Sequence, residues 1–542
     1  MTSSVPLPRN EPALQYHPGS PERAAIRAAL DELTTAAPHA LPMTIAGGQV
    51  HGAGAAFMVT APHRHELVLG TGHEATAAEV AAAVDAALAA RAEWADAPFT
   101  ARAAVFLRAA DLLAGPWRAR INAATMLGQS KTVVQAEIDA ACELIDFWRS
   151  NVHFAAHLAD DQPHSPPGAW NRLEMRPLEG FVVAITPFNF TSIAGNLPTA
   201  PALLGNTVVW KPSTTQQLSA SLLMDLLTEA GLPPGVINLV TGRGEAVSEV
   251  ALPHRDLAGV HFTGSTATFH HLWSRISDSI DGYRTYPRLV GETGGKDFVV
   301  AHASASPEAL LTGLLRGAFE YQGQKCSAAS RAYVPRGLWE ELRGPLAEAT
   351  ESLRMGDPTD LRNFMGAVID ERAFRRHEAV MAAARSDDTI RLVAGGECDG
   401  TVGWFVRPTI FETDNPHHEL MERELFGPIL TVHPYDETDW ETLLHTVDAT
   451  SPYGLTGAVF ATDRAAIDTA AHVLRNAAGN FYINDKPTGA VVGQQPFGGS
   501  RASGTNDKAG SAVNLLRWVS PRVIKETFVP PTDWRYPHQL PD

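Results

Sequence analysis

Cysteine is scarce in this sequence, and long apolar segments are missing. The 542 residues contain three cysteines, Cys142, Cys326 and Cys398, none in CxxC spacing. Three cysteines exclude a disulfide framework and indicate a reducing compartment, and the missing CxxC pairs argue against a cysteine zinc site. No apolar run approaches the ~18 residues that a membrane-spanning helix needs. We therefore expect no membrane insertion and no metal.

Positive charge is also low. The chain has 43 Lys and Arg against 60 Asp and Glu, which gives a net charge of -17. Such a surface argues against a nucleic-acid groove. The N-terminal stretch MTSSVPLPRNEPALQYHPGSPER has no apolar core, too few arginines and too many acids for a targeting peptide. We expect a cytoplasmic protein, with a processed organelle protein as the alternative.

The chain is too long for one ordinary core, so we expect two or three domains. Residues 1–40 are proline-rich and then helical, which is typical of an arm on a larger body. Residues 75–150 are alanine-rich with helical periodicity. Apolar side chains at helical spacing predict one buried face between residues 131 and 150; they are Val134, Ile138, Ala141, Ile145 and Trp148.

From residue 180 onward, short apolar segments alternate with helical ones. The first set is FVVAIT, TVVWKP, VINLVTG and GVHFTGS, and a second set lies between about 297 and 484, namely FVVA, RAYVP, ILTVHPY and TGAVFAT. This alternation predicts βαβ units and parallel sheets. The fold class is therefore α/β with two α/β domains, and the Gly-rich segment GETGGKD lies between them.

The fingerprint GxGxxG is absent, so no standard dinucleotide motif is present. Several predicted strands nevertheless end in polar or glycine turns, where open parallel sheets bind ligands. Gly264 and Ser265 can offer backbone N–H groups to a phosphate at a helix start, and Lys211 can add a cation or bind a ribose. Ordinary turn chemistry explains any one of these turns equally well.

Cys326 lies in EYQGQKCSAAS, among small and polar residues. A small-residue loop leaves room for a substrate, and a thiolate attacks carbonyl carbons. The residues alone leave a structural cysteine as an equal alternative, and we expect Lys325 to be solvated. Glu292 follows an apolar strand in LVGETGGKD, where a general base can reach water, although a surface acid fits locally as well. Asn189 in TPFNFT is a candidate oxyanion donor or a turn residue.

Eight segments in one order resemble the aldehyde dehydrogenase superfamily: TPFNF, WKPS, FTGS, GETGGKD, GQKCS, ELFGP, PYGLTGAVF and QPFGGSRASG. The resemblance covers nearly the whole chain. It implies a Rossmann-like cofactor domain, a catalytic domain and a small β oligomerisation flap. The implied boundaries are 1–40 for the arm, 41–160 and 180–290 for the NAD-binding domain, 291–485 for the catalytic domain, and 161–179 with 515–542 for the flap.

The resemblance also assigns roles. Cys326 is the nucleophile, Glu292 the base that activates water, and Asn189 an oxyanion donor together with the Cys326 N–H. The intermediate passes a hydride to the nicotinamide cofactor NAD and becomes a thioester. The implied cofactor residues are Thr186, Pro187, Phe188, Lys211, Ser213, Gly264, Ser265, Glu292, Glu424 and Phe426. Thr214 stands where many relatives carry an acid for the ribose, so NADP is less firmly excluded.

GSPER, FTGSTATFHHLW and FGGSRASGTNDKAGS further resemble the 1-pyrroline-5-carboxylate dehydrogenase branch of that superfamily. That branch oxidises L-glutamate 5-semialdehyde to L-glutamate in proline breakdown, and a separate proline dehydrogenase acts upstream. The implied substrate residues are Ser327, Ala502 and Ser503 for the carboxylate and Glu137 for the ammonium. We expect a homodimer or higher homo-oligomer. Another aldehyde such as succinic semialdehyde, or an inactive scaffold, is the alternative.

Overall fold

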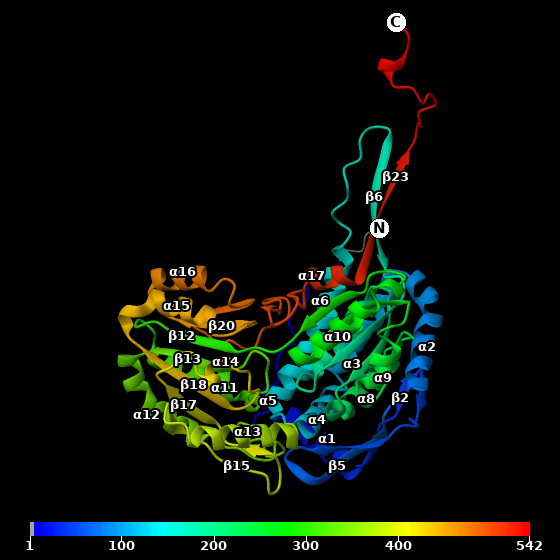
Figure 1. Cartoon of the computed structure of the whole chain (residues 1–542). Helices are drawn as coiled ribbons and strands as arrows, with labels where there is room; N and C mark the ends of the chain where they lie inside the picture. The colour runs from blue at the N-terminus through cyan, green and yellow to red at the C-terminus, as the bar shows by residue number, and fades with distance from the viewer. Residues whose placement is uncertain (1–4) are drawn as a thin grey trace.

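A computed structural model describes residues 5–542 and shows two lobes, each built on a seven-stranded sheet (Figure 1). A two-stranded ribbon projects from one lobe, and the C-terminal residues extend beyond it. None of the helices in residues 5–542 is both long and apolar enough to cross a membrane.

The first sheet has the strand order β11-β10-β7-β8-β9-β2-β3. Its strands are β2 (Met43–Ile45), β3 (Gly48–Val50), β7 (Phe181–Thr186), β8 (Thr207–Pro212), β9 (Ile237–Leu239), β10 (Leu257–Thr263) and β11 (Arg288–Glu292). The strands from β7 to β11 pair in parallel, with Thr263 opposite Glu292 and Ile185 opposite Lys211. Their carboxyl ends therefore meet at one edge, as predicted for ligand binding.

Helices cover both faces of this sheet because successive strand residues point to opposite sides. In β7, Val182 and Ala184 belong to one buried core, and Phe181 and Val183 belong to another. The first core includes residues of α3 (Phe99–Ala114), α4 (Arg118–Gln129), α6 (Glu143–His157), α7 (Thr191–Leu203) and α8 (Gln217–Glu229). The second includes residues of α2 (Ala77–Asp96), α9 (Glu245–Val250) and α10 (Thr266–Asp278).

The second sheet has the order β14-β17-β18-β13-β12-β20-β21 and is parallel except for β14. Its strands are β12 (Asp297–Ala301), β13 (Ala329–Pro335), β14 (Ile390–Ala394), β17 (Thr409–Thr413), β18 (Ile429–Tyr435), β20 (Thr456–Phe460) and β21 (Asn480–Ile483). Its helices are α11 (Pro307–Phe319), α12 (Arg336–Ser352), α13 (Glu371–Arg385), α15 (Trp440–Ala449) and α16 (Arg464–Val473). The predicted α/β architecture with two sheets is confirmed.

The helix predicted between residues 131 and 150 is interrupted. It consists of α5 (Val133–Ala136), the π-helical turn η1 (Glu137–Cys142) and α6. Ala141, Ile145 and Trp148 are buried as predicted, but Val134 and Ile138 are 45% and 40% exposed. A π turn holds more residues than an α turn, so the face before it rotates away from the face after it. The prediction of one continuous buried face was wrong for this reason.

The arm and two smaller sheets complete the first lobe. Residues 5–20 run without regular structure to α1 (Pro21–Thr35), whose first turn Ser20 caps by accepting from the Arg23 N–H. A three-stranded sheet of β1 (His39–Ala40), β4 (Ala56–Ala61) and β5 (Arg64–His73) follows, which the sequence did not predict. The projecting ribbon pairs β6 (Ala169–Pro177) with β23 (Val519–Thr527) inside the range predicted for the flap.

The remaining elements are short. They are α14 (Glu419–Glu422), α17 (Ala512–Leu515), β15 (Cys398–Asp399), β16 (Phe405–Val406), β19 (Tyr453–Gly454), β22 (Ser500–Arg501) and the single turns η2 (Thr214–Gln216), η3 (Ile280–Gly282), η4 (Glu320–Gly323), η5 (Glu437–Asp439), η6 (Leu516–Trp518) and η7 (Pro537–Gln539). Of these, η4 bears directly on the site because it precedes Cys326.

Candidate active site

Cys326 lies in the connection between η4 and β13, and the backbone before it is strained. Tyr321, Gln322 and Gly323 have φ of 51°, 54° and 63°, the left-handed region that side-chain-bearing residues rarely adopt. Such conformations persist only where the surroundings hold them. Here the strained turn carries the chain from α11 into the loop that presents the thiol.

Two glutamines hold this loop in place. The Gln322 side chain donates to the carbonyls of Ser130 and Ala367 at 3.0 and 2.7 Å, and its oxygen accepts from the Gly366 N–H at 3.0 Å. The Gln324 side-chain oxygen accepts from the Ile369 N–H at 2.9 Å. The sequence analysis missed both residues, because their partners are far away in the sequence.

Glu292 is the last residue of β11. Its backbone is held by Gly504, with which it forms an isolated antiparallel bridge. Burial, and then the nearby Asp507 carboxyl, raise the pKa of Glu292 well above its ordinary value, while Lys508 opposes this shift. A carboxylate whose pKa is raised is a stronger proton acceptor, which suits a general base.

Glycines bring the base and the nucleophile loop together. A Cβ at Gly295 would lie 2.3 Å from the Cys326 carbonyl oxygen, and a Cβ at Gly294 would lie 2.2 Å from a Glu424 carboxylate oxygen. Glu424 accepts from the Gly295 N–H at 3.0 Å. The backbone contact requires glycine at position 295, which gives the GETGGKD segment a packing role.

The Cys326 side chain is partly exposed and has acidic neighbours. Burial raises the pKa of its thiol, and the Asp297, Glu292 and Glu424 carboxyls raise it further. The thiol therefore has to lose its proton before it attacks. Asn189 is buried and lies against the same loop, where its amide donates to the Gln324 carbonyl at 2.9 Å. The structure thus brings the three predicted catalytic residues to one region.

A cavity of about 310 Å³ contains both Cys326 and Glu292 in its wall. Ser327 also lines it, and its hydroxyl lies 2.8 Å from the Thr488 hydroxyl, which lines the cavity too. Further wall residues come from α6 and η1, from residues 486–497, and from the N-terminal arm. The cavity therefore joins both lobes at the nucleophile.

Charged side chains cluster on one wall of this cavity. Lys325 is buried, not solvated as predicted, and its ammonium lies 3.4 Å from the Asp139 carboxylate, which Lys131 also contacts. Burial, and then the Asp139 charge, raise the pKa of Glu143 to about 8. Glu143 accepts a hydrogen bond from the Ser192 hydroxyl and lines the cavity.

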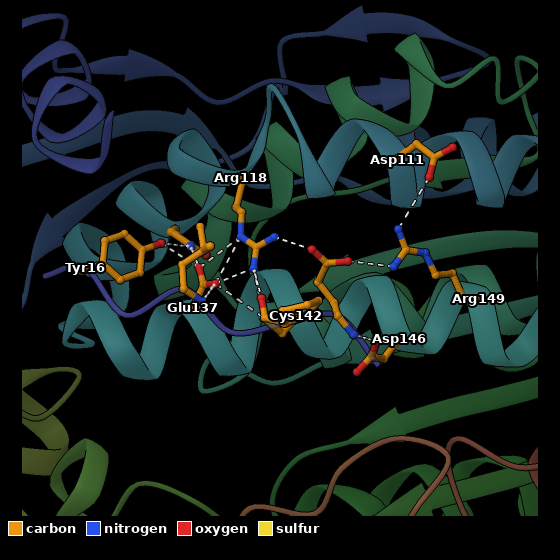
Figure 2. A network of polar contacts seen from close by, with 11 residues as sticks. Tyr16, Asp111, Arg118, Glu137, Cys142, Asp146 and Arg149 are labelled. Carbon is orange, nitrogen blue, oxygen red and sulfur yellow. Dashed lines mark hydrogen bonds and ion pairs between the residues drawn. The ribbon is translucent and has the colours of Figure 1, made fainter. Parts of the chain in front are cut away.

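Glu137, the residue predicted to bind the substrate ammonium, is not among the cavity-lining residues. It is 1% exposed, and its carboxylate accepts from the side chains of Arg118, Asn122 and Tyr16 (Figure 2). Its partners therefore come from α4 and the arm. The assignment rested on the resemblance, whereas in the structure these partners hold the Glu137 carboxylate outside the cavity wall.

Ala502 and Ser503 are also displaced from their predicted role. The Ala502 and Ser503 carbonyls accept from the Thr293 hydroxyl and N–H at 2.6 and 3.0 Å, and the Ser503 hydroxyl accepts from the Gly454 N–H at 3.1 Å. Neither residue lines the cavity. They support the strand end that carries Glu292, while Thr488 and Gly489 supply the wall beside Ser327.

The predicted cofactor residues lie at the carboxyl edge of the first sheet and beside it. Thr186 is the last residue of β7 and Lys211 the last but one of the adjacent β8, and Ser213 donates its N–H to the Thr186 carbonyl at 3.1 Å. Pro187 and Phe188 follow β7, and the Phe188 ring lies 5.8 Å from that of Phe426, whose φ is 56°.

At the next strand end, Gly264 donates its N–H to the Glu292 carbonyl at 3.1 Å, and Ser265 caps α10 by accepting from the Thr268 N–H at 3.1 Å. Burial lowers the pKa of Lys211 to about 8, while the nearby Glu74 carboxylate opposes that shift. The sequence analysis missed Glu74, which lies far ahead of the KPS segment.

The chain is similar to known proteins over nearly its whole length. Residues 50–523 match the sequence model of the Aldehyde dehydrogenase family. The chain is 49% identical over 536 residues to the mitochondrial delta-1-pyrroline-5-carboxylate dehydrogenase of Mus musculus, covering 99% of this chain and 95% of the mouse protein. The NAD-bound structure of Delta-pyrroline-5-carboxylate dehydrogenase from Mycobacterium tuberculosis is 59% identical, with a TM-score of 0.96 and 99% of each chain covered. A Thermus 1-pyrroline-5-carboxylate dehydrogenase with bound NAD is 31% identical, with a TM-score of 0.91, and 97% and 100% are covered.

These matches confirm the superfamily and the branch that the motifs resembled. One expectation is corrected. The relatives from Mus musculus, Bos taurus and Homo sapiens are named as mitochondrial, which contradicts the predicted cytoplasmic location. That prediction depended on the composition of the first residues, which does not determine where a folded chain works.

Proposed function

The chain belongs to the aldehyde dehydrogenase family, and from this premise we propose that it oxidises L-glutamate 5-semialdehyde to L-glutamate with NAD. The observation that carries the proposal is that one cavity has Cys326, Glu292 and the half-buried Glu143 in its wall. The similarity to pyrroline-carboxylate dehydrogenases over 99% of the chain supports the choice of substrate.

NAD fits the carboxyl edge of the first sheet. Lys211 is a desolvated ammonium that suits ribose hydroxyls, and the start of α10 at Ser265 presents free N–H groups and a positive dipole to a phosphate. Phe426, beside Phe188, and Glu424, beside Gly295, lie between this edge and the Cys326 loop. When bound, NAD supplies the electron-pair acceptor for the hydride that leaves the substrate carbon. Because Glu74 lies near Lys211, a carboxylate is present despite Thr214, which supports NAD over NADP.

Catalysis begins when the Cys326 sulfur attacks the aldehyde carbon and forms a thiohemiacetal. The thiol proton leaves to solvent, which reaches the partly exposed Cys326 side chain. The Asn189 amide has a second N–H beside the one bound to Gln324, and this donor together with the Cys326 N–H stabilises the oxyanion. Loss of one such donor typically lowers the rate by ~10²–10³.

Loss of hydride turns the thiohemiacetal into a thioester on Cys326. Glu292 then takes a proton from water, and the hydroxide equivalent attacks the thioester carbon and releases the acid and the free thiol. The raised pKa of Glu292 favours this step, because a more basic carboxylate is a better proton acceptor.

The head group of the substrate needs one acceptor and one set of donors. Glu143 lines the cavity and forms no ion pair within residues 5–542, although Lys131 and Lys325 are near, so it is the acceptor for the α-ammonium. The paired hydroxyls of Ser327 and Thr488, with the backbone N–H groups near Gly489, are donors for the α-carboxylate. This replaces the assignments of Glu137, Ala502 and Ser503.

The exposed β6–β23 ribbon supports association with further copies of this chain. A ribbon of only two strands is marginal on its own in water, and Trp170 and Val523 on it are 49% and 63% exposed. This supports a homodimer or higher homo-oligomer joined through the β6–β23 ribbon. The substrate has to be supplied by an enzyme that oxidises proline.

The test is NADH formation by the purified chain with 1-pyrroline-5-carboxylate, succinic semialdehyde and propanal at equal concentrations. We expect kcat/KM for the pyrroline-carboxylate substrate to exceed the others by at least about tenfold, which corresponds to about 1.4 kcal/mol of head-group binding. A higher kcat/KM for succinic semialdehyde would show that this aldehyde, and not glutamate semialdehyde, is the substrate. No NADH with any of the aldehydes would indicate an inactive scaffold.

A further inference from the structure

The N-terminal arm lies outside the part of the chain that matches the family, and yet it reaches the aldehyde cavity. The family match begins at residue 50, whereas Asn10, Glu11 and Ala13 line the cavity that contains Cys326. Asn10 and Ala13 are exposed, so the arm lies where the cavity meets solvent. A segment added to the family core therefore forms the outer wall of the active site.

A buried network fixes the arm to α4, η1 and α6 (Figure 2). The Glu11 carboxylate accepts from Arg118 and Arg149 at 2.6 and 2.7 Å. The Leu14 N–H and the Tyr16 hydroxyl donate to the two oxygens of Glu137 at 2.8 and 2.7 Å. Removing one partner of such a network leaves a buried charge unpaired, which is strongly unfavourable. The arm is thus held in one position by charges.

Asn10 connects this fixed arm to the facing loop. Its amide donates to the Asp146 carboxylate on α6 and to the Val492 carbonyl, both at 2.8 Å. Its oxygen accepts from the Gln494 side chain at 2.9 Å. Val492 lies in residues 486–497, the segment that also carries Thr488 and Gly489 in the cavity wall. One side chain therefore ties that segment to the first lobe across the cavity.

We propose that the arm is part of the aldehyde-binding site and that Asn10 is a positioning residue for substrate selection. By holding residues 486–497 against α6, Asn10 sets the distance between Glu143 on one wall and Ser327 with Thr488 on the other. An aldehyde that carries both an ammonium and a carboxylate needs that distance, and a simple aldehyde does not. This inference rests on the proposed function.

The test compares Asn10→Ala and Asn10→Asp with wild type. The Asp variant keeps the shape but replaces two donors by a carboxylate that faces Asp146. Gln15→Ala is the matched control, because Gln15 is an exposed amide on the same arm whose side chain bonds only to the Ala13 carbonyl among the described residues. Melting temperature is measured beside kcat and KM.

Asn10→Ala is expected to raise KM for glutamate semialdehyde about three- to tenfold, the equivalent of about one net hydrogen bond. Asn10→Asp should raise it further, and Gln15→Ala should leave it unchanged. KM for propanal should stay within about twofold in every variant. Equal loss with both substrates, or no change with either, would overturn the proposal. A failure of the proposed function is separate, because it would appear in wild type as absence of a preference for glutamate semialdehyde.

Discussion

At the scale of single residues, specificity depends on the ionisation of Glu143. Burial and Asp139 place its pKa at about 8. Below that pH the carboxyl is neutral and cannot pair with an ammonium, and above it the carboxylate is charged. KM for glutamate semialdehyde should therefore fall as the pH rises through about 8.

The matched variant is Glu143→Gln, which keeps the hydrogen bond with Ser192 but cannot ionise. The substitution should raise KM roughly thirtyfold. This corresponds to a loss of about 2 kcal/mol of binding free energy, the lower end of the range for a charge pair that loses one partner. Its KM should also lose the pH dependence. Rates are referred to the concentration of open aldehyde at each pH, and propanal is the control substrate. A Glu143→Gln variant that retained the wild-type pH profile would refute the assignment.

Cys326, Glu292 and the cofactor residues were proposed from eight ordered segments that resemble one superfamily, because each local pattern alone left a structural role equally open. Glu143, Thr488 and Glu74 have no local pattern, and only the fold brings them to the site. Glu137 was assigned from the resemblance alone, which does not show side-chain partners, and in the structure its partners are Arg118 and the arm.

At the scale of elements, the apolar strands that end in glycine turns could be predicted from the sequence. The irregular turns, namely η1 and the left-handed residues before Cys326, could not. The strands of both sheets follow the alternation of apolar and helical segments. The π turn η1 and the left-handed run before Cys326 depend on tertiary contacts, so propensity cannot reveal them. Both irregular elements border the active site, where strain is commonly stored.

The strained turn leads to a prediction for Gln322→Ala. The substitution leaves the Ser130 and Ala367 carbonyls and the Gly366 N–H without this partner, at about 1–3 kcal/mol for each buried group that stays unpaired. We expect a lower melting temperature and a kcat that falls equally for glutamate semialdehyde and propanal, because the thiol is misplaced for every aldehyde. A selective loss with one substrate would assign Gln322 to substrate binding instead.

At the scale of the whole molecule, residues of both lobes line the cavity. The two-stranded ribbon projects away from the lobes (Figure 1). Val523→Lys places a charge on the exposed face of β23, and we expect it to shift the protein toward the monomer in light scattering after gel filtration. Val402→Lys is the control, because that valine is 60% exposed against 63% for Val523 but lies between β15 and β16. An unchanged mass for Val523→Lys, or an equal shift in the control, would show that the ribbon does not hold the oligomer.

We propose that glutamate semialdehyde is oxidised while bound to Cys326 and that Glu292 activates the water that releases glutamate. Glu292→Gln keeps the shape of the base but cannot accept a proton, so the thioester should accumulate. Mixing this variant with NAD and the substrate should give a burst of NADH equal to the enzyme concentration, and peptide mass spectrometry should find a glutamyl group on Cys326. Cys326→Ala in the same background should give neither. A glutamyl group on another residue, or a burst that survives in Cys326→Ala, would contradict the account.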